Sequence, residues 1–302
     1  MSDSLVRTGA RALPAGLDAV GPLGFGCWRL TTTDDAQAQA LVETALDLGM
    51  NLVDTADVYG LDYGGAGFGG NEEVLGRVLA AAPQLRERMV LATKGGIVPP
   101  MPYDSSDAHL RSAVDASLRR LGVEVIDLYQ IHRPDMFAHP IQVADTLGSL
   151  VAEGKIRAVG ISNHTPDQHD ALAAHLEVPL ATSQPEYSPA FLGPLRDGTF
   201  DRCMRDGVVP LAWSPLGGGR LMSGEGVRPE LIATLDELAE REGVDRAAIC
   251  VAFVLAHPSA PVALLGTQNP DHLLAATTAL TVQLDRADVY RIVQDSEGLP
   301  LP

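Results

Sequence analysis

Cysteine is scarce in this chain: there are three, Cys27, Cys203 and Cys250, far apart in the sequence. Because no CxxC pair occurs, the sequence indicates neither a disulfide framework nor a structural zinc site. Few, scattered cysteines fit a reducing compartment, and we expect the cytoplasm. The opening MSDSLVRTGA lacks the apolar segment of a signal peptide. No run approaches the roughly 20 apolar residues that cross a bilayer.

Positive charge is also scarce, since 22 Lys and Arg stand against 39 Asp and Glu, for a net charge of −17. We find no basic stripe, which argues against nucleic acid as a partner. The same shortage argues against an anionic membrane surface. We interpret the acidity as an aid to solubility.

The remaining composition, with 46% apolar, 20% charged and 5% aromatic residues, is that of an ordinary folded protein. A chain of 302 residues could hold two domains, but an α/β barrel reaches this length as one. Because no linker rich in Pro, Ser or charge and no internal repeat interrupts it, we predict one domain over residues 1–302.

Short β-branched runs alternate with longer amphipathic stretches, a pattern typical of strands followed by helices. The runs predict eight strands, at Pro22–Leu30, Asn51–Asp54, Met89–Thr93, Val125–Ile131, Ile156–Ile161, Leu180–Gln184, Val208–Trp213 and Pro261–Gly266. The stretches predict helices at Asp34–Leu48, Glu72–Ala81 (capped by Asn71), Asp107–Leu121, Ile141–Ala152, Pro166–Leu176, Gly193–Arg205 and Pro229–Glu242. This alternation predicts an α/β fold, a (β/α)8 TIM barrel.

A doubly wound sheet is the alternative architecture, and it normally has a GxGxxG turn after its first strand. Here Gly24 and Gly26 fall inside the first predicted strand, and Cys27, Trp28 and Arg29 follow. We therefore favour the barrel. It carries extra helices late in the chain, at Asp245–His257 and Leu284–Gln294.

Nearly every predicted strand ends in a polar or aromatic residue. In an α/β barrel these ends meet on one face, where catalytic groups gather. Together they predict a constructed site rather than isolated caps. The residues concerned are Asp54, Lys94, His132, Ser162-Asn163, Gln184, Trp213-Ser214 and Gly266-Thr267.

The chemistry of this group follows from its members. Asp54 and Lys94 come from adjacent strands and should pair to offset their desolvation. Tyr59 lies five residues beyond Asp54, and a nearby ammonium would lower its pKa from about 10. We expect Tyr59 to act as a proton donor and His132 to orient a substrate oxygen.

Seven segments of the chain resemble the aldo-keto reductases, in the same order and over nearly its whole length. They are GMNLVDTADVYG (49–60), VLATKGG (90–96), DLYQIHRPD (127–135), GKIRAVGISN (154–163), TSQPEYSP (182–189), AWSPLGGGR (212–220) and LLGTQNPDHL (264–273).

The resemblance implies an NAD(P)H-dependent oxidoreductase that reduces an aldehyde or ketone to an alcohol, or catalyses the reverse reaction. Its catalytic tetrad would be Asp54, Tyr59, Lys94 and His132. In the branch of the family that reduces steroid carbon–carbon double bonds, the position of His132 holds Glu. Histidine here therefore points to carbonyl chemistry on a small-molecule substrate, and the family implies a monomer or small homo-oligomer.

The resemblance also implies the residues that bind the cofactor. Ser162, Asn163 and Gln184 would contact the carboxamide, and Trp213 replaces the tyrosine that usually stacks on the nicotinamide. Ser214, Leu216, Gly218 and Arg220 match the loop over the pyrophosphate, where glycine allows close approach.

The adenosine end departs from the family pattern, which usually has Lys or Arg near the start of the segment 266–276 and Arg six residues later. This chain has Gly266 or Gln268 and then His272. Since a 2′-phosphate prefers Arg or Lys, the choice between NADP(H) and NAD(H) stays open. We favour NADP(H) slightly, with Thr267, Gln268 and His272 as contacts.

Six of the eleven residues of Gly60–Gly70 are glycine, so we expect a mobile loop with no helix or strand of its own. Beside Tyr59 it either reaches the substrate or is a tolerated surface insertion. Trp28, Tyr59 and His132 are the predicted substrate contacts. Tyr63, Phe68 and Arg133 are weaker candidates.

Two other functions compete with a reductase. The first is a cofactor-binding regulatory protein with little turnover, against which the intact tetrad argues. The second is a metal-dependent hydrolase that would use Asp54, Asp57, His132 and His139. The chain lacks HxH and HExxH spacings, and Lys94 would repel a cation, so we predict no metal.

Overall fold

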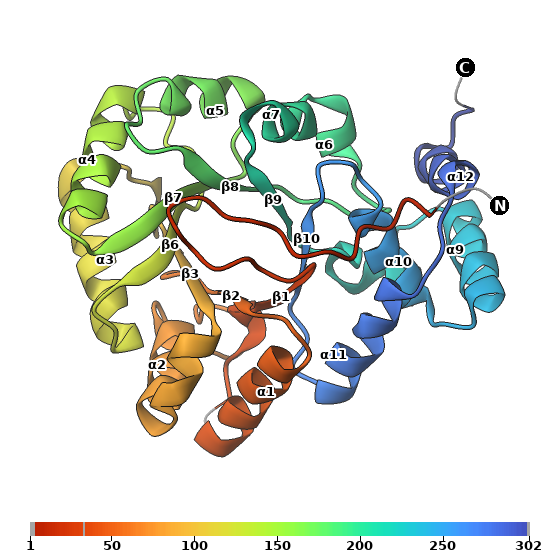
Figure 1. The fold of residues 1–302 in the computed structure, drawn as a ribbon, viewed down its shortest axis with the longest axis horizontal. Helices are drawn as coiled ribbons and strands as arrows, with labels where there is room; N and C mark the ends of the chain where they lie inside the picture. The colour runs from red at the N-terminus through yellow and green to blue at the C-terminus, as the bar shows by residue number, and fades with distance from the viewer. Residues whose placement is uncertain (1–3, 33, 301–302) are drawn as a thin grey trace.

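Eight parallel strands close into a barrel in the computed structural model, which describes residues 4–32 and 34–300. This confirms the predicted architecture, and Figure 1 shows the helices around the strands. The strand order around the barrel is β1-β10-β9-β8-β7-β6-β3-β2. The strands are β1 (Leu23–Gly26), β2 (Leu52–Asp54), β3 (Val90–Gly95), β6 (Ile126–Ile131), β7 (Ile156–Ser162), β8 (Leu180–Gln184), β9 (Val209–Ala212) and β10 (Val262–Leu265).

The helices follow the strands and include both of the late helices that the sequence predicts, α10 and α12. They are α1 (Asp35–Asp47), α2 (Gly70–Ala81), α3 (Asp107–Leu121), α4 (Pro140–Ala152), α5 (Pro166–Ala173), α6 (Gly193–Arg196), α7 (Thr199–Asp206), α8 (Arg220–Ser223), α9 (Pro229–Glu242), α10 (Arg246–Leu255), α11 (Pro270–Ala276) and α12 (Arg286–Glu297). Within the described residues, no helix combines the length and apolar character that crossing a membrane requires.

The first predicted strand is too long. After β1 the chain turns into a short 3-10 helix, η1 (Cys27–Arg29). The side-chain amide of Asn71 donates to the carbonyl oxygens of Cys27 (2.7 Å) and Trp28 (2.9 Å). Those oxygens are therefore bonded to a side chain instead of to a neighbouring strand.

The prediction for Asn71 is also wrong, because α2 begins at Gly70 and its N-cap is Gly69 in the left-handed region (φ 84°).

The predicted helix Gly193–Arg205 breaks into α6 and α7. Gly198 lies between them with φ 88°, and Asp197 accepts the backbone N–H of Thr199 at 2.8 Å.

Some elements were not predicted at all. The β3–α3 connection contains a hairpin of β4 (Ile97–Val98) and β5 (Met101–Tyr103), and α11 follows β10. In the part of the chain that the structure describes, three further 3-10 helices connect the elements, at η2 (Pro83–Arg88), η3 (Gly217–Gly219) and η4 (Thr277–Leu280). All of these are short, so a periodicity argument has few residues to work with.

The interior of the barrel is apolar near the start of the strands. Leu13, Leu17 and Val20, from the segment before β1, pack with the inward-facing residues of the strands. Figure 1 shows this N-terminal segment, coloured red, crossing the barrel. It therefore closes one end, and the side chains of a site must gather at the other. The inward-facing residues are Leu52, Val90, Ala92, Leu128, Ala158, Ala181, Val209, Leu211, Val262 and Leu264.

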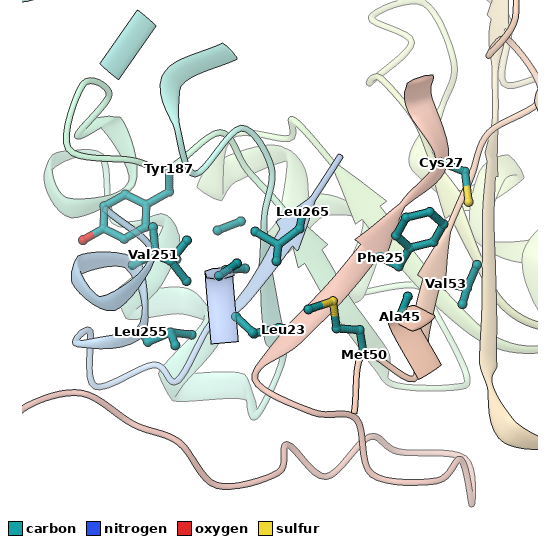
Figure 2. Close-up of a cluster of buried hydrophobic side chains, with 14 of the residues drawn as sticks. Leu23, Phe25, Cys27, Ala45, Met50, Val53, Tyr187, Val251, Leu255 and Leu265 are labelled. Carbon is teal, nitrogen blue, oxygen red and sulfur yellow. The ribbon is translucent and has the colours of Figure 1, made fainter. Parts of the chain in front are cut away.

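A second apolar layer lies between the strands and the helices. Figure 2 shows part of it, with Phe25 and Val53 of the strands near Ala45 of α1, and Tyr187 near Val251 of α10. Burial of such side chains stabilises the fold by about 25 cal/mol per Å². This layer holds the helices on the barrel.

One part of this outer layer is polar. Glu72 of α2 is buried, accepts a hydrogen bond from Thr93 of β3 (2.5 Å) and pairs with Arg120 of α3 (2.6 Å). Asp57 and Tyr129 are buried close by, and a Cβ on Gly95 would overlap the Tyr129 hydroxyl. Burial raises the pKa of Asp57 well above its usual range, and the charge of Glu72 raises it further.

Replacing Asp57 by Asn tests this polar layer. The folded protein keeps the Asp57 proton above the ordinary aspartate pKa of about 3.9, whereas the unfolded chain loses it. Ionisation of Asp57 therefore favours the unfolded chain increasingly as the pH rises. The effect is about 1.4 kcal/mol for each pH unit between the pKa of the group in the unfolded chain and its pKa in the folded protein. We expect Asp57→Asn to increase the free energy of unfolding at pH 7, with the gain shrinking toward pH 4.5.

Urea unfolding of both proteins across this pH range measures the effect. Asp145→Asn, which changes an exposed residue of α4, is the matched control and should show no such trend. A gain that does not depend on pH would mean that Asp57 is ionised in the folded protein.

Candidate active site

The carboxyl ends of the strands bring together the polar residues that the sequence places there. In the barrel register Lys94 lies beside Gln130, and Ser162 lies beside Gln184. Asp54 ends β2, and His132 directly follows β6. Because all eight strands are parallel, these side chains share the end opposite the N-terminal segment.

Lys94 is at the centre of the site and is fully buried, with 0% of its surface exposed. Its ammonium donates to Asp54 Oδ2 at 2.6 Å, to the Thr55 carbonyl oxygen at 2.8 Å and to the Tyr59 hydroxyl at 3.1 Å. An ammonium has three donors, so every one finds an acceptor. Burial lowers the pKa of Lys94, but Asp54 and Tyr59 outweigh this and raise it overall, so the lysine stays charged.

Asp54 is held from both sides. Its Oδ2 pairs with Lys94, while its Oδ1 accepts hydrogen bonds from Gln130 (3.1 Å) and Gln184 (3.0 Å). Thr182 in turn donates to Gln130 Oε1 at 3.2 Å. The Asp54–Lys94 pair is therefore fixed by polar side chains from two further strands, as a buried ion pair requires.

Tyr59 differs from the expectation in one respect. Burial raises its pKa above the ordinary value; Lys94 lowers it and Asp54 raises it. The predicted effect of Lys94 has the right sign, but the predicted net direction is wrong because desolvation outweighs it. Tyr59 thus keeps its proton, while its oxygen accepts from Lys94.

His132 faces Tyr59, with ring centroids 5.6 Å apart and planes at 79°. Burial lowers the pKa of His132 well below its usual range, and the charges of Lys94 and Arg133 lower it further. The imidazole is therefore neutral, and a neutral ring donates one hydrogen bond and accepts another. Its Nδ1 is buried and has no partner among the described residues.

Sequence reasoning missed two residues whose hydrogen bonds hold this site together. The sequence signal for Gln130 is that it is a polar residue inside an otherwise apolar strand. Asn71 was interpreted as a helix cap, yet its backbone N–H donates to the Tyr59 carbonyl oxygen (3.3 Å) while its side chain holds η1. Asn71 therefore ties the end of β1 to the segment that carries Tyr59.

The residues predicted to contact the nicotinamide lie beside the tetrad. Asn163 donates to Ser162 Oγ (2.8 Å) and to the His132 carbonyl oxygen (3.2 Å), and its Oδ1 accepts from the Trp213 indole (3.1 Å). Asn163 takes φ 59°, which asparagine tolerates better than most residues. Asn163 thus links the Trp213 indole to the backbone of His132.

The 214–220 segment forms a glycine-rich turn. Gly217, Gly218 and Gly219 all have positive φ, and a Cβ on Gly218 or Gly219 would meet nothing within 4 Å. Arg220 donates from Nε to the Gly217 carbonyl oxygen at 3.0 Å, which closes the turn before α8. This open, backbone-lined turn, with Ser214 and Leu216 before it, has the chemistry that a pyrophosphate needs.

The predicted adenosine contacts surround the start of α11. Thr267 Oγ1 lies 3.4 Å from His272 Nδ1, and Gln268 donates to the Thr267 carbonyl oxygen at 3.3 Å. Gly266 directly follows β10, close to Gly26 of β1. The side chains of Thr267, Gln268 and His272 are polar and at least partly exposed.

The remaining candidate substrate residues lie in three different places. Trp28 and Tyr63 meet with ring centroids 4.7 Å apart. Phe68 instead lies against Arg120 of α3, whose guanidinium is 5.9 Å from the ring centroid. Arg133 lies close enough to His132 to affect its pKa.

The residues of the competing metal site are not gathered. His139 accepts the backbone N–H of Ile141 at the start of α4 (3.3 Å), while Asp57 lies in the outer polar layer. Among residues 4–32 and 34–300, no three His, Cys, Asp or Glu side chains form a group that could hold a metal ion.

Comparisons with known proteins agree with this geometry. The model of the aldo/keto reductase family matches residues 22–296. The chain is 48% identical to the 6-dehydroglucose reductase of Novosphingobium aromaticivorans over 100% of both chains. It is 36% identical to the 6-dehydroglucose reductase of Agrobacterium fabrum, covering 89% of this chain and 91% of that one.

A solved structure, the glycerol dehydrogenase from Gluconobacter oxydans, superposes with a TM-score of 0.83 at 28% identity and covers 97% of each chain. The family match and the first two relatives span almost the whole barrel, including all four residues of the predicted tetrad. The chain therefore belongs to the aldo/keto reductase family, and it is an NAD(P)H-dependent oxidoreductase that reduces carbonyl groups.

Proposed function

We propose that the chain reduces the aldehyde of 6-dehydroglucose to the alcohol, with Tyr59 as the proton donor. The observation that carries the catalytic part is the hydrogen-bonded series Asp54–Lys94–Tyr59, in which a protonated phenol contacts a buried ammonium. The substrate is suggested by the two relatives of that name, one of them 48% identical over the full length.

The residues of the tetrad divide the chemical work. A bound nicotinamide supplies the hydride for the carbonyl carbon. Tyr59 gives its proton to the carbonyl oxygen, and Lys94 stabilises the phenolate that forms. Asp54 keeps Lys94 charged and in place. The neutral imidazole of His132 donates a hydrogen bond to the same carbonyl oxygen and orients it.

Side chains next to the tetrad suit the nicotinamide. The amide oxygens of Asn163 and Gln184 would accept the N–H groups of its carboxamide, with Ser162 as a further contact. Trp213, whose indole is already held by Asn163, offers a ring for stacking. The turn at Ser214, Leu216, Gly218 and Arg220 would cover the pyrophosphate. Gln184 also bonds Asp54, so one side chain would join the cofactor to the catalytic pair.

The preference between NADP(H) and NAD(H) depends on the residues that would surround the 2′-phosphate, which are Thr267, Gln268 and His272. We propose NADP(H) slightly ahead of NAD(H), because these polar side chains gather around the start of α11. No Lys or Arg stands among residues 266–276 to bind a 2′-phosphate, so the preference should be weak.

We also propose a cytoplasmic protein that works as a monomer or small homo-oligomer and binds no nucleic acid. All three cysteines are buried free thiols, which suits a reducing compartment. The strongly acidic charge of −17 disfavours phosphate backbones.

Replacing Tyr59 by Phe tests the proton donor. The variant keeps the ring but loses the hydroxyl, so we expect kcat for 6-dehydroglucose to fall by about 10²–10⁴-fold. Cofactor affinity, followed through the fluorescence of Trp213, should change by less than about twofold, since the residues proposed to bind the cofactor are intact. A variant that keeps most of its kcat would show that another group delivers the proton.

Replacing Gln268 by Arg tests the phosphate contact. A new guanidinium should tighten NADPH relative to NADH by about tenfold, because hydrogen bonds to charged groups are worth about 1.5–3 kcal/mol. Titrations with both cofactors measure the ratio. The control Gln283→Arg adds the same charge at an exposed position outside this segment and should leave the ratio unchanged. An unchanged ratio in Gln268→Arg would place the 2′-phosphate elsewhere.

A further inference from the structure

Four side chains at the site end of the barrel have no part in the mechanism above. Trp28 and Arg29 belong to η1, and Asp62 and Tyr63 belong to the β2–α2 loop. We call these four residues the rim cluster. The Trp28 indole donates to Asp62 Oδ2 at 3.2 Å, and the Trp28 and Tyr63 rings meet edge to face at 81°.

Arg29 completes the cluster. Its guanidinium carbon lies 5.1 Å from the Tyr63 ring centroid and 5.8 Å from that of Trp28, close enough for cation–π attraction. Tyr63 is also held through its backbone, since Thr31 Oγ1 donates to the Tyr63 carbonyl oxygen at 3.2 Å. The cluster therefore combines two aromatic rings, one carboxylate and one guanidinium, and its formal charges cancel.

The rim cluster lies beside the reacting end of the site. β1 and β2 are neighbours, with Gly26 paired to Asp54. The chain that follows β1, which is η1, and the chain that follows β2, which carries Tyr59, therefore leave the barrel at the same edge. Asn71 joins them, because it bonds the carbonyl oxygens of Cys27, Trp28 and Tyr59. The rim cluster and Tyr59 therefore lie at the same edge of the barrel, where a substrate bound at Tyr59 could reach the cluster.

The β2–α2 loop holds its part of the cluster in place through hydrogen bonds of its own backbone. The Gly67 N–H donates to the Gly60 carbonyl oxygen (2.9 Å), and the Gly65 N–H donates to that of Asp62 (3.1 Å). A Cβ on Gly60 or Gly65 would overlap loop backbone, so two of the glycines serve close packing. Asp62 and Tyr63 are thus presented on a folded turn, which reduces the entropy lost on binding.

From this arrangement we propose that the rim cluster is the subsite that recognises the hydroxyl groups of a sugar aldehyde, an inference that rests on the proposed function. The carboxylate of Asp62 accepts hydrogen bonds from hydroxyls, and the Arg29 guanidinium donates to them; both bonds are charge-assisted. The rings of Trp28 and Tyr63 cover the C–H faces of the sugar. Tyr63 is 52% exposed, so its ring is available to a ligand.

The cancelled charge of the cluster offers no net attraction to an acidic sugar, because Arg29 attracts a carboxylate or sulfonate while Asp62 repels it, and this suits a neutral sugar. The carboxylate and the guanidinium also disfavour a plain alkyl chain, whose contact would desolvate both without replacing their hydrogen bonds. The chemical class that fits the rim cluster is therefore a neutral polyhydroxylated aldehyde.

A pair of substrates with six carbons each tests the proposal: 6-dehydroglucose, which carries hydroxyls, and hexanal, which has none. In Asp62→Ala we expect kcat/KM for 6-dehydroglucose to fall by about tenfold or more, mainly through KM, because a charge-assisted hydrogen bond is lost. The value for hexanal should change by less than about twofold. Tyr63→Leu should lower the sugar value in the same selective way, and Asp145→Ala, on the exposed face of α4, is the matched control.

The outcomes separate the two proposals. If the wild-type protein reduces hexanal but not 6-dehydroglucose, the proposed substrate is wrong and the rim cluster loses its assignment. If the wild-type protein reduces the sugar, but Asp62→Ala and Tyr63→Leu lower both substrates equally or neither, the substrate stands and the subsite is refuted. Cofactor titration of each variant shows whether the protein is folded.

Discussion

The structure depends above all on the burial of one charge, the Lys94 ammonium. A buried ammonium without partners would be neutralised or would destabilise the fold by several kcal/mol, so three acceptors must converge on it. Asp54, Thr55 and Tyr59 provide them. Asp54 in turn needs donors for its second oxygen, and these come from Gln130 and Gln184. Satisfying one charge thus connects residues of β2, β3, β6 and β8, and the same connections fix the positions of the residues proposed as the tetrad.

The side chains of β3 point alternately into and out of the barrel, and this links the site to the outer layer. Lys94 points into the barrel, while its neighbour Thr93 points outward and bonds Glu72 of α2. The Asp57 N–H donates to the Lys94 carbonyl oxygen (3.0 Å), so the backbone of the Tyr59 segment is attached to the same strand. Because successive side chains of a strand face opposite sides, one short strand holds both the proposed catalytic site and the position of α2. The aldo/keto reductase activity therefore rests on a scaffold that is polar on both faces at this point.

Much of this could be predicted from the sequence. The order of strands and helices, and the residues at the strand ends, follow from local patterns and from the rule that parallel strands end on one face. Gln130 was not predicted as functional, because a single glutamine inside a strand does not show what it faces. Asn71 was misread, because its partners Cys27 and Trp28 lie more than forty residues earlier in the chain. The rim cluster likewise joins Trp28 to Asp62 across 34 positions, a contact that no local pattern encodes.

The sequence by itself determined the fold class and the placement of Asp54, Lys94 and His132 at the ends of strands, because hydrophobic periodicity and strand-end placement are local properties of the chain. The tertiary structure alone decided the protonation of the site. Whether Tyr59 has a raised or lowered pKa depends on the balance between its burial and its contact with Lys94, and burial outweighs the contact. The neutral state of His132 and the raised pKa of Asp57 have the same origin. Desolvation is a sum over everything that surrounds a group in space, and it exists only once distant segments have packed together.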